Sequence, residues 1–319
     1  MRILLTGGAG FIASHLAESY YYEGHEVIIV DNLHSGSKDN LSSILGKTGV
    51  SFYQTDIRDQ EALHFVFAKH KPDIVNHHAA QKSVPLSLTN PGYDADINII
   101  GLLNLLQMTK LYPINNFIYV SSGGALATEI TDNTKSKETD IPQLKTPYAI
   151  SKFTGEQYIR IYAELNEFDY TILRYSNVYG PRQTSDGECG VIPIFVNNIM
   201  NGTRSRLLTY PDMPKGCSRD YLFVSDVVRI NLLVTRNPLN QVINVSSSKE
   251  MYMLDIYEEI QRVFGSNIPI DITGPRLGDS RRSVLDSSLA LQLTGWNPVV
   301  DFSEGLEIIR NHIKEKLLV

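Results

Sequence analysis

A glycine-rich run near the start of the chain joins a short apolar segment to a helix-length amphipathic one. It reads Thr6-Gly7-Gly8-Ala9-Gly10-Phe11-Ile12-Ala13 and directly follows the apolar segment Arg2–Leu5. Glycines allow a tight turn and let a pyrophosphate approach the backbone, and the N-terminus of the following helix offers free N–H groups to an anion. The spacing is G-x-x-G-x-x-A rather than G-x-G-x-x-G, so an ordinary strand–helix turn stays open as the alternative.

An acidic residue stands at the end of the second apolar run, Glu26–Val30. It is Asp31, 21 residues after Gly10. In a dinucleotide fold, a carboxylate here accepts hydrogen bonds from the adenosine ribose hydroxyls and repels a 2′-phosphate. The stretch Asn32–Ser37 contains no Arg that could pair with such a phosphate. These residues predict NAD rather than NADP as the cofactor, with a strand-end cap as the alternative role of Asp31.

Short apolar runs alternate with helix-length segments through the first half of the chain. The runs are rich in Val, Ile, Tyr and Phe, and most lack polar alternation, which is typical of strands buried on both faces. The alternation predicts strand–helix–strand units and hence an α/β fold with a doubly wound parallel sheet. The predicted strands are Arg2–Leu5, Glu26–Val30, Val50–Tyr53, Asp73–Asn76, Asn116–Ser121 and Tyr170–Arg174, and the predicted helices include Ser14–Glu23, Glu61–His70 and Asn98–Leu111.

The texture of the sequence changes after about Tyr179. Pro and Gly gather in Gly180–Pro193 and Thr209–Tyr221, and long loops in a compact fold are more often binding loops than filler. A predicted strand at Gln241–Ser246 and helices near Met253–Phe264 and Ser303–Lys316 follow. We expect a dinucleotide-binding domain formed by residues 1–178 plus about 220–248, and a smaller C-terminal α/β substrate domain formed by about 179–219 plus 249–319.

Composition limits the partners of the chain. Its 319 residues include 29 Lys and Arg against 35 Asp and Glu, and the net charge of −6 gives no general attraction to nucleic acid or to an anionic membrane. Cys189 and Cys217 are too few for a disulfide framework, and His77-His78 lacks further metal ligands at useful spacing. The chain has no signal-peptide pattern and no apolar run of the ~18 residues that a membrane span needs, so we expect a cytoplasmic protein. From the isolated His77-His78 pair we also expect no metal site.

Tyr148 and Lys152 form the second chemical signal. Residues at i and i+4 share one face of a helix, and a nearby ammonium stabilises a phenolate and lowers the pKa of the tyrosine toward working pH. The pair follows a predicted strand that ends in Ser121-Ser122-Gly123-Gly124, where a serine hydroxyl can orient a reacting hydroxyl. Alone, Y-x-x-x-K is a common surface pattern, but the order of strand, serine and Tyr–Lys pair predicts a catalytic group of Ser122, Tyr148 and Lys152.

With these motifs in place, the chain resembles the extended short-chain dehydrogenases/reductases, whose cofactor domain is a Rossmann fold. It is most similar to the NAD-dependent nucleotide-sugar epimerases, in particular the UDP-glucose 4-epimerases. The resemblance covers nearly the whole chain. It rests on TGGAGFIASH at 6–15, DNLHSG at 31–36, DI at 56–57, HHAAQKSV at 77–84, VSSGGA at 120–125, YAISK at 148–152, RYSNVYGPRQ at 174–183, RDYLFVSDV at 219–227 and RLGD at 276–279.

The resemblance implies roles for matching positions. Cofactor-binding residues would be Gly7, Gly10, Phe11 and Ile12 at the pyrophosphate, Asp31, Asn32, Ser35 and Gly36 at the adenosine ribose, Asp56 and Ile57 at the adenine, and Ala79, Ala80, Lys82, Asn98, Tyr148, Lys152 and Tyr175 toward the nicotinamide. Substrate-binding residues would be Lys82, Ser122, Tyr148, Asn177, Val191, Tyr210, Arg219, Arg276 and Asp279. The guanidinium forks of Arg219 and Arg276 suit a diphosphate.

The resemblance also implies an isomerase that interconverts UDP-glucose and UDP-galactose, a UDP-hexose substrate, through a 4-keto intermediate. The related 4,6-dehydratases carry an Asp-Glu pair after the serine and the decarboxylases a Glu, where this chain has Gly123-Gly124. Other nucleotide-sugar epimerases, acting on UDP-N-acetylglucosamine or UDP-glucuronate, stay open. Ser283 stands where some epimerases have a bulky Tyr, and a small residue there would admit N-acetyl hexosamines. A non-enzymatic NAD sensor is a further alternative. A homodimer through Asn98–Leu111 and Thr154–Asn166 is expected by the same resemblance.

Overall fold

A computed structural model describes residues 1–128, 134–185, 190–274 and 281–317, and the chain divides into two compact units. Unit 1 comprises Met1–Leu126, Leu144–Arg174 and Val227–Ile243. Unit 2 comprises Ala127–Gln143, Tyr175–Asp226 and Asn244–Val319. Each unit is therefore assembled from separate stretches of the sequence.

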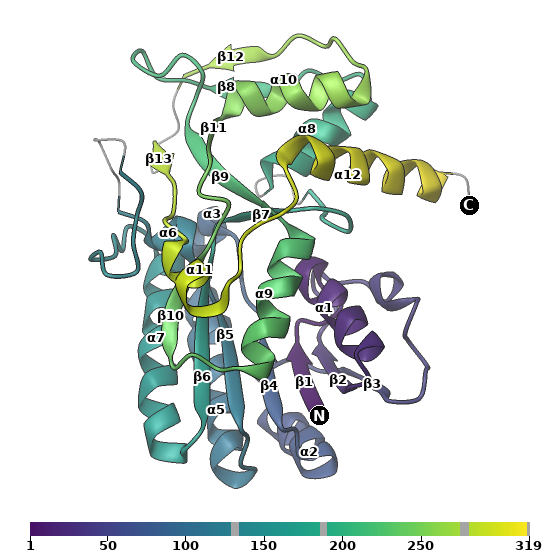
Figure 1. Ribbon diagram of the computed structural model, residues 1–319, viewed down its shortest axis with the longest axis vertical. Coiled ribbons are helices and arrows are strands. Elements are labelled where there is room, and N and C mark those ends of the chain that lie inside the picture. Colours follow the sequence, from purple (N-terminus) through teal and green to yellow (C-terminus); the bar gives the residue numbers. More distant parts are fainter. Residues whose placement is uncertain (129–133, 186–189, 275–280, 318–319) are drawn as a thin grey trace. The chain divides into compact units, whose positions relative to one another are not determined.

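The centre of unit 1 is a seven-stranded sheet in the order β10-β6-β5-β4-β1-β2-β3 (Figure 1). The pairs β1–β2, β1–β4, β2–β3 and β4–β5 are parallel, and the strand order reverses between β1 and β4, where ligands of such sheets bind. The strands are β1 (Arg2–Thr6), β2 (Glu26–Asp31), β3 (Val50–Gln54), β4 (Ile74–His77), β5 (Asn116–Ser122), β6 (Asp169–Tyr175) and β10 (Gln241–Val245).

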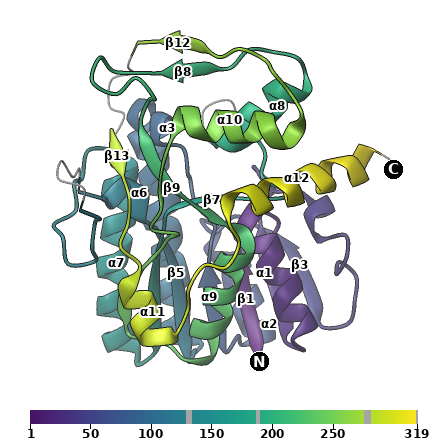
Figure 2. The same cartoon turned by 45° about the horizontal axis from the view of Figure 1, so that its top comes forward.

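Helices cover both faces of this sheet, which is why its strands are apolar without alternation. Tyr20 Oη of α1 lies 2.7 Å from Thr235 Oγ1 of α9, so these helices share one face, while α2, α5 and α7 pack together on the other (Figures 1 and 2). The helices are α1 (Phe11–Tyr22), the 3-10 turn η1 (Lys38–Leu41), α2 (Gln60–His70), α3 (Val84–Thr89), α4 (Pro91–Ala95), the π-helix η2 (Asp96–Gly101), α5 (Leu102–Leu111), α6 (Gly123–Leu126), α7 (Pro147–Asn166) and α9 (Val224–Arg236).

Unit 2 is organised around β9 (Ser218–Phe223). This strand pairs in parallel with β7 (Asn177–Tyr179) and β13 (Arg282–Ser283) and antiparallel with β11 (Glu250–Tyr252). A separate parallel pair joins β8 (Arg206–Leu208) to β12 (Asp271–Thr273). The remaining helices are α8 (Val191–Met200), α10 (Met253–Phe264), α11 (Ser288–Thr294) and α12 (Phe302–Leu317), and α10 packs against both α8 and α12.

The unit boundaries differ from the expected domain ranges at several places. Ala127–Gln143 groups with unit 2, because the Ser136 amide donates to Val284 O over 2.8 Å and Asn244 Nδ2 donates to Ser136 O over 3.1 Å. Residues 175–178 and 220–226 group with unit 2 because β7 and β9 pair there. Residues 244–248 also lie in unit 2, although β10 starts in unit 1.

The predicted strands and the predicted helices are confirmed with small shifts at their ends. The short strands of unit 2, the six-residue β9 that overlaps the loop-rich stretch Thr209–Tyr221, and the helices α8 and α9 were not predicted. Strands of two or three residues carry no readable periodicity.

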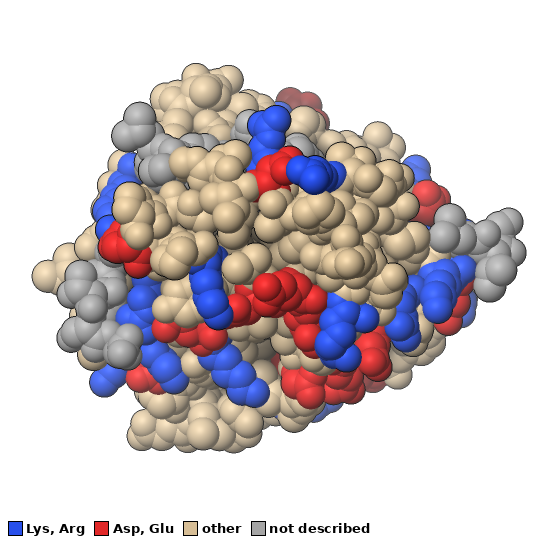
Figure 3. Space-filling model, turned by 90° about the horizontal axis from the view of Figure 1, so that it is seen from above, with Lys and Arg blue, Asp and Glu red and all other residues tan. Residues whose placement is uncertain are grey.

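Figure 3 shows one face of the molecule, where Lys and Arg side chains are interspersed with Asp and Glu. On this face, attraction of an anion depends on local groups rather than on a broad field of one sign. Across the residues that the structure describes, no helix is both long and apolar enough to cross a membrane.

Candidate functional site

The glycine turn lies at the carboxyl end of β1, between β2 and β4. Gly7 has a φ of +68°, and a Cβ added to it would lie 2.8 Å from the backbone N of Ala79, so only glycine fits. The turn closes through Gly7 N to Val30 O at 2.8 Å and Gly10 N to Gly7 O at 2.9 Å. Gly10 is the N-cap of α1 and supplies no side chain to its first turn. This leaves a side-chain-free cradle at a helix N-terminus, which fits a pyrophosphate.

Asp31 is tied to this turn rather than being a simple strand end. Its Oδ2 accepts a hydrogen bond of 2.9 Å from the Ala9 amide, and its Oδ1 accepts one of 2.7 Å from the Leu33 amide. A Cβ on Gly36 would lie 2.8 Å from the Ala9 carbonyl carbon, so the loop after β2 also approaches the turn closely. The acid and the glycine turn, 22 residues apart for Ala9 and Asp31, thus form one structure.

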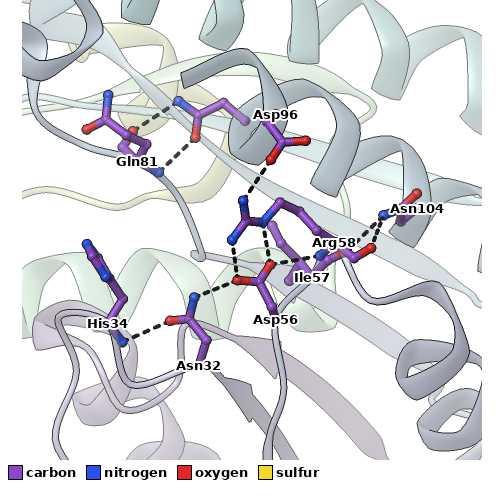
Figure 4. A network of polar contacts seen from close by, with 9 residues as sticks. Asn32, His34, Asp56, Ile57, Arg58, Gln81, Asp96 and Asn104 are labelled. Carbon is purple, nitrogen blue, oxygen red and sulfur yellow. Dashed lines mark hydrogen bonds and ion pairs between the residues drawn. The ribbon is translucent and has the colours of Figure 1, made fainter. Parts of the chain in front are cut away.

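Asp56 is the centre of a polar network that also includes Asn32 (Figure 4). Its two oxygens accept hydrogen bonds of 2.9 Å from Arg58 Nε and Nη2, and Oδ2 accepts another of 2.8 Å from Asn32 Nδ2. These bonds, led by those of Arg58, hold the pKa of the Asp56 carboxyl well below its usual range. Arg58 Nη1 also reaches Asp96 Oδ2 in η2, over 2.7 Å.

The neighbouring Ile57 is 4% exposed and packs against Gly101, where a Cβ would lie 2.5 Å from Ile57 Cδ1. Asn104 Nδ2 donates to the carbonyls of Ile57 and Arg58 over 3.1 and 3.2 Å, as Figure 4 shows. The sequence analysis did not single out Arg58, Asp96 or Asn104. The only signal available was a basic residue two positions after Asp56.

The segment after β4 carries Ala79, Ala80 and Lys82, and Asn98 holds it in place. The Ala79 amide donates to Thr6 Oγ1 over 3.2 Å, and Lys82 is exposed. Asn98, 2% exposed in the π-helix η2, accepts from the Gln81 amide at 2.9 Å and donates back to Gln81 O at 3.0 Å. Asn98 therefore fixes the backbone of this segment with its own amide group.

The Tyr148–Lys152 pair lies in the first turns of α7. Thr146 caps this helix by accepting from the Ala149 amide at 3.2 Å, with Pro147 at its first position. Helix α7 approaches β5 closely because Gly155 has no side chain; a Cβ there would lie 2.2 Å from Tyr119 Oη. Tyr148 is half-buried.

Lys152 is 5% exposed, and its Nζ donates to Val120 O at 3.0 Å and lies 5.3 Å from the Tyr119 ring centroid. Burial lowers the pKa of Lys152 to about 8, against the opposing charges of Asp94 and Glu156. The protonation of a lysine with a pKa in this range depends, near neutral pH, on nearby charges such as a phenolate.

Ser122 ends β5, and its Oγ accepts a hydrogen bond of 3.3 Å from the Ala125 amide, at the start of α6. The next two residues are Gly123 and Gly124, so no acidic side chain follows the serine. The predicted catalytic residues Ser122, Tyr148 and Lys152 thus lie at the end of β5 and in the first turns of α7, two elements that pack together.

Of the predicted substrate residues of unit 2, Asn177 and Arg219 lie on the paired strands β7 and β9. Asn177 Nδ2 donates to Asp220 O at 3.1 Å, and Arg219 Nη1 donates to Ser218 O at 2.7 Å. The guanidinium carbon of Arg281 lies 4.7 Å from the centroid of the Tyr210 ring, and Val191 is the first residue of α8. Tyr175, 5% exposed, ends β6. Arg276, Asp279 and Cys189 lie outside the described residues. Arg281 was not singled out from the sequence, although the pair Arg281-Arg282 was visible there.

His77 pairs with the glycine turn rather than with further metal ligands: its Nδ1 lies 2.7 Å from Thr6 Oγ1. In the described part of the chain, no group of three or more His, Cys, Asp or Glu side chains could hold a metal ion.

The sheet, the glycine turn at its switch point and the acid after β2 define a dinucleotide-binding protein of the Rossmann type. The sequence pattern of the NAD dependent epimerase/dehydratase family matches residues 3–246. The chain belongs to this family, and its cofactor is NAD.

Three relatives illustrate the similarity. The solved UDP-glucose 4-epimerase of Thermotoga maritima, determined with UDP-glucose, is 38% identical with a TM-score of 0.93, and the match covers 99% of this chain and 100% of that one. The UDP-glucose 4-epimerase of Mycolicibacterium smegmatis is 34% identical over 98% of this chain and 99% of the relative. The solved UDP-N-acetylglucosamine 4-epimerase of Methanobrevibacter ruminantium, in complex with UDP-N-acetylmuramic acid, is 31% identical with a TM-score of 0.90, covering 99% and 98%. These relatives support a nucleotide-sugar 4-epimerase.

Proposed function

We propose that this chain interconverts UDP-glucose and UDP-galactose. The observation that carries the proposal is the pair Tyr148 and Lys152, one turn apart on α7, together with Ser122 and the two glycines that follow it. Elimination of water from the sugar needs an additional acid and base beside the serine, and Gly123 and Gly124 supply neither. Oxidation and reduction at one carbon needs, besides the hydride carrier, only a group that takes and returns one proton.

In the proposed reaction, the Tyr148 phenolate accepts the proton of the sugar 4-hydroxyl, and Ser122 Oγ hydrogen-bonds to the same oxygen. The Lys152 ammonium stabilises the phenolate. NAD supplies a hydride acceptor and donor for the sugar C4. Tyr148 returns the proton after the 4-keto sugar has rotated in its binding site to present its other face. The enzyme therefore ends each cycle in its starting protonation state.

The cofactor contacts are proposed from the family resemblance, supported in part by the geometry of unit 1. The cradle at Gly7 and Gly10, with Phe11 and Ile12 opening α1, would hold the pyrophosphate. Asp31, with Asn32, Ser35 and Gly36, would hold the adenosine ribose, and Asp56 and Ile57 the adenine. Ala79, Ala80, Lys82, Asn98, Lys152 and Tyr175 would complete the nicotinamide side.

The residues proposed to bind the sugar nucleotide in unit 2 are Asn177, Val191, Tyr210, Arg219, Arg276 and Asp279. Their support is the resemblance of RYSNVYGPRQ, RDYLFVSDV and RLGD to the family's motifs, and the suitability of arginine for a diphosphate. Arg281 contacts the segments of both Tyr210 and Arg219. Its guanidinium lies over the Tyr210 ring, and its carbonyl oxygen accepts a long hydrogen bond of 3.5 Å from Arg219 Nη1.

A second candidate is the same reaction on UDP-N-acetylglucosamine. It is favoured by the similarity to the Methanobrevibacter ruminantium enzyme and by the small side chain of Ser283, which is 1% exposed in β13. One panel separates the two: the purified protein is incubated with UDP-glucose, UDP-galactose, their N-acetyl forms and UDP-glucuronate, and the products are separated. We expect UDP-glucose and UDP-galactose to interconvert fastest. Turnover of only the N-acetyl or uronate forms would replace the proposal, and no turnover at all would favour an NAD sensor.

We further propose a homodimer through η2, α5 and α7. Ile100 and Leu111, and likewise Ile150 and Ile161, are 11 residues apart, about three helical turns, so each pair shares a face. All four are exposed, as is Leu165 at 69%. Exposed apolar stripes on adjacent helices are typical of self-association. Sedimentation should give a dimer for the wild type and a monomer for Ile161→Glu/Leu165→Glu, with Phe65→Glu on α2 as the matched exposed control; a wild-type monomer would refute the dimer.

A further inference from the structure

Two buried carboxylates, Glu156 and Asp94, raise the pKa of Lys152 against the effect of burial, and among the described residues only Glu156 forms an ion pair with another cation. Glu156, fully buried, accepts bonds of 2.8 and 2.7 Å from Arg174 Nε and Nη2 and one of 2.6 Å from Ser121 Oγ. Its charge is therefore matched by a bidentate guanidinium. Of the two, Glu156 is also the weaker influence on the pKa of Lys152.

Asp94, in α4, is the other carboxylate and is 1% exposed. Its Oδ1 accepts bonds from two neutral amides, Gln81 Nε2 at 2.7 Å and Asn98 Nδ2 at 3.1 Å. Its Oδ2 is buried and has no hydrogen-bond partner among the described residues. A buried carboxylate is costly to keep ionised unless a cation balances it, so the charge of Asp94 needs a counter-charge.

Helix α4 packs directly against α7, which carries Lys152. A chain of hydrogen bonds also joins Asp94 to the same turn of α7. Asn98 Nδ2, bound to Asp94, lies 3.3 Å from Ser151 Oγ, and Ser151 Oγ donates to Tyr148 O at 3.0 Å. Asp94 is thus held rigidly beside the turn that carries the Tyr148–Lys152 pair.

The other groups around Lys152 do not replace this counter-charge. His77 and His78 on the β4 side are kept neutral because burial lowers the pKa of each, and the Lys152 charge lowers it further. Burial raises the pKa of the Tyr119 hydroxyl, on β5. Asp96 of η2 is paired with Arg58, and Lys110 at the far end of α5 is exposed. Helices α3 and α6 contain no titratable side chain.

We propose that Asp94 is the counter-ion that keeps the buried Lys152 protonated, and so acts as a positioning residue for the Tyr148–Lys152 pair. This inference rests on the proposed function for its role in catalysis, but the charge coupling itself is a property of the folded protein. Without Asp94, Lys152 would lose its proton at lower pH and would no longer stabilise the phenolate.

The first test measures the titration of Lys152 in the NAD-bound protein, without substrate. Protein labelled with 13C at lysine Cε is titrated by NMR, and the signal of Lys152 is identified by its loss in Lys152→Arg. In Asp94→Asn, we expect the midpoint of Lys152 to fall by about one pH unit or more. Ser151→Ala is the matched control, because it breaks the same hydrogen-bond chain without changing a charge. A midpoint that moves no further in Asp94→Asn than in Ser151→Ala would overturn the proposal.

A second measurement covers the case in which Asp94→Asn folds poorly. Melting temperatures are compared for the wild type, Asp94→Asn, Lys152→Met and the double variant at pH 7. If each charge exists to balance the other, the double variant is destabilised by less than the sum of the single variants. Additive losses would contradict the coupling.

Activity then links the two proposals. If the chain is an epimerase, the alkaline limb of kcat/KM should move to lower pH in Asp94→Asn and stay in place in Ser151→Ala. Absence of turnover in the wild type would refute the proposed function but not the counter-ion, which the titration and the melting temperatures test without substrate. A shifted titration with an unmoved alkaline limb would refute the positioning role of Asp94 in the reaction.

Discussion

Gly7 and Ala79 approach so closely that a Cβ on Gly7 would lie 2.8 Å from the Ala79 nitrogen. The two residues stand at the carboxyl ends of the neighbouring strands β1 and β4, which pair Thr6 with His77. Ala79 is in turn held by its bond to Thr6 Oγ1 at 3.2 Å. The cofactor turn and the segment that follows β4 therefore form one rigid contact at the switch point of the sheet.

Gly7→Ala should abolish stable NAD binding and lower the melting temperature. The new methyl group would meet backbone atoms that cannot rotate away, and the φ of +68° disfavours any side chain. The matched control is Gly24→Ala, which has a φ of +81° but nothing within 4 Å of the added Cβ. It carries the backbone strain alone, at about 1–3 kcal/mol. NAD content is measured by absorbance after purification, and equal NAD retention in both variants would contradict the cradle.

Asp31→Ala should weaken NAD binding about 10- to 100-fold, because a charged acceptor is lost. It should also narrow the preference for NAD over NADP, since the carboxylate no longer repels a 2′-phosphate. Binding of each cofactor is measured by calorimetry. Asp73→Ala is the control, because it too removes a carboxylate that accepts from backbone N–H, from Arg2 at 2.7 Å, but at the opposite end of the sheet. An unchanged preference in Asp31→Ala would argue that Asp31 is only a structural cap.

Tyr148→Phe should reduce turnover of UDP-glucose by about 10²-fold or more while NAD stays bound, because the proton acceptor is removed and the ring is kept. Tyr158→Phe, on the same helix and packed against the core, serves as the control and should turn over normally. Rates are measured under saturating substrate. A rate for Tyr148→Phe near that of the wild type would remove Tyr148 from the mechanism.

Asp220→Asn should change how stability depends on pH. Asp220 is fully buried in unit 2, and burial raises its pKa to about 6. Because this lies above the value of about 3.9 in the unfolded chain, the folded state binds the proton more tightly. The stability from the neutral form is present below about pH 4 and is lost as pH rises through about 6, an effect of about 2–3 kcal/mol.

The melting temperature of the wild type should therefore fall relative to that of Asp220→Asn as the pH rises from about 4 to about 6, and should change little relative to it above that range. The variant keeps an oxygen for the bonds that Asp220 Oδ2 accepts from Ser246 Oγ and from the Leu285 amide. If the melting temperatures of the wild type and of Asp220→Asn change in parallel with pH across this range, Asp220 stays ionised in the folded protein.

Much of the candidate site could be predicted from the sequence because it follows local rules. Glycine is needed where φ is positive, an acid ends a buried strand, and Tyr and Lys at i and i+4 share a helix face. The structure places Gly7, Asp31, Tyr148 and Lys152 on the elements that these rules predicted. The resemblance extended the reading to Asp56 and Ile57, whose role no spacing rule would have indicated.

Other features escaped the sequence because they depend on partners far along the chain. Arg58 is two residues from Asp56, but its bond to Asp96 spans 38 positions. Asp94 looks like an ordinary acid in the first turn of a short helix, and nothing in NPGYDADIN shows that it is 1% exposed.

The sequence by itself determined the parallel α/β sheet, the glycine turn and the Tyr–Lys helix, because short apolar runs, glycine conformation and helical spacing act over a few residues. Only the tertiary structure decided which charges are buried together. Whether Lys152 keeps its proton depends on its burial among α4, α7 and β5 and on the Asp94 carboxylate, which lies on α4. That environment exists only once the chain has folded.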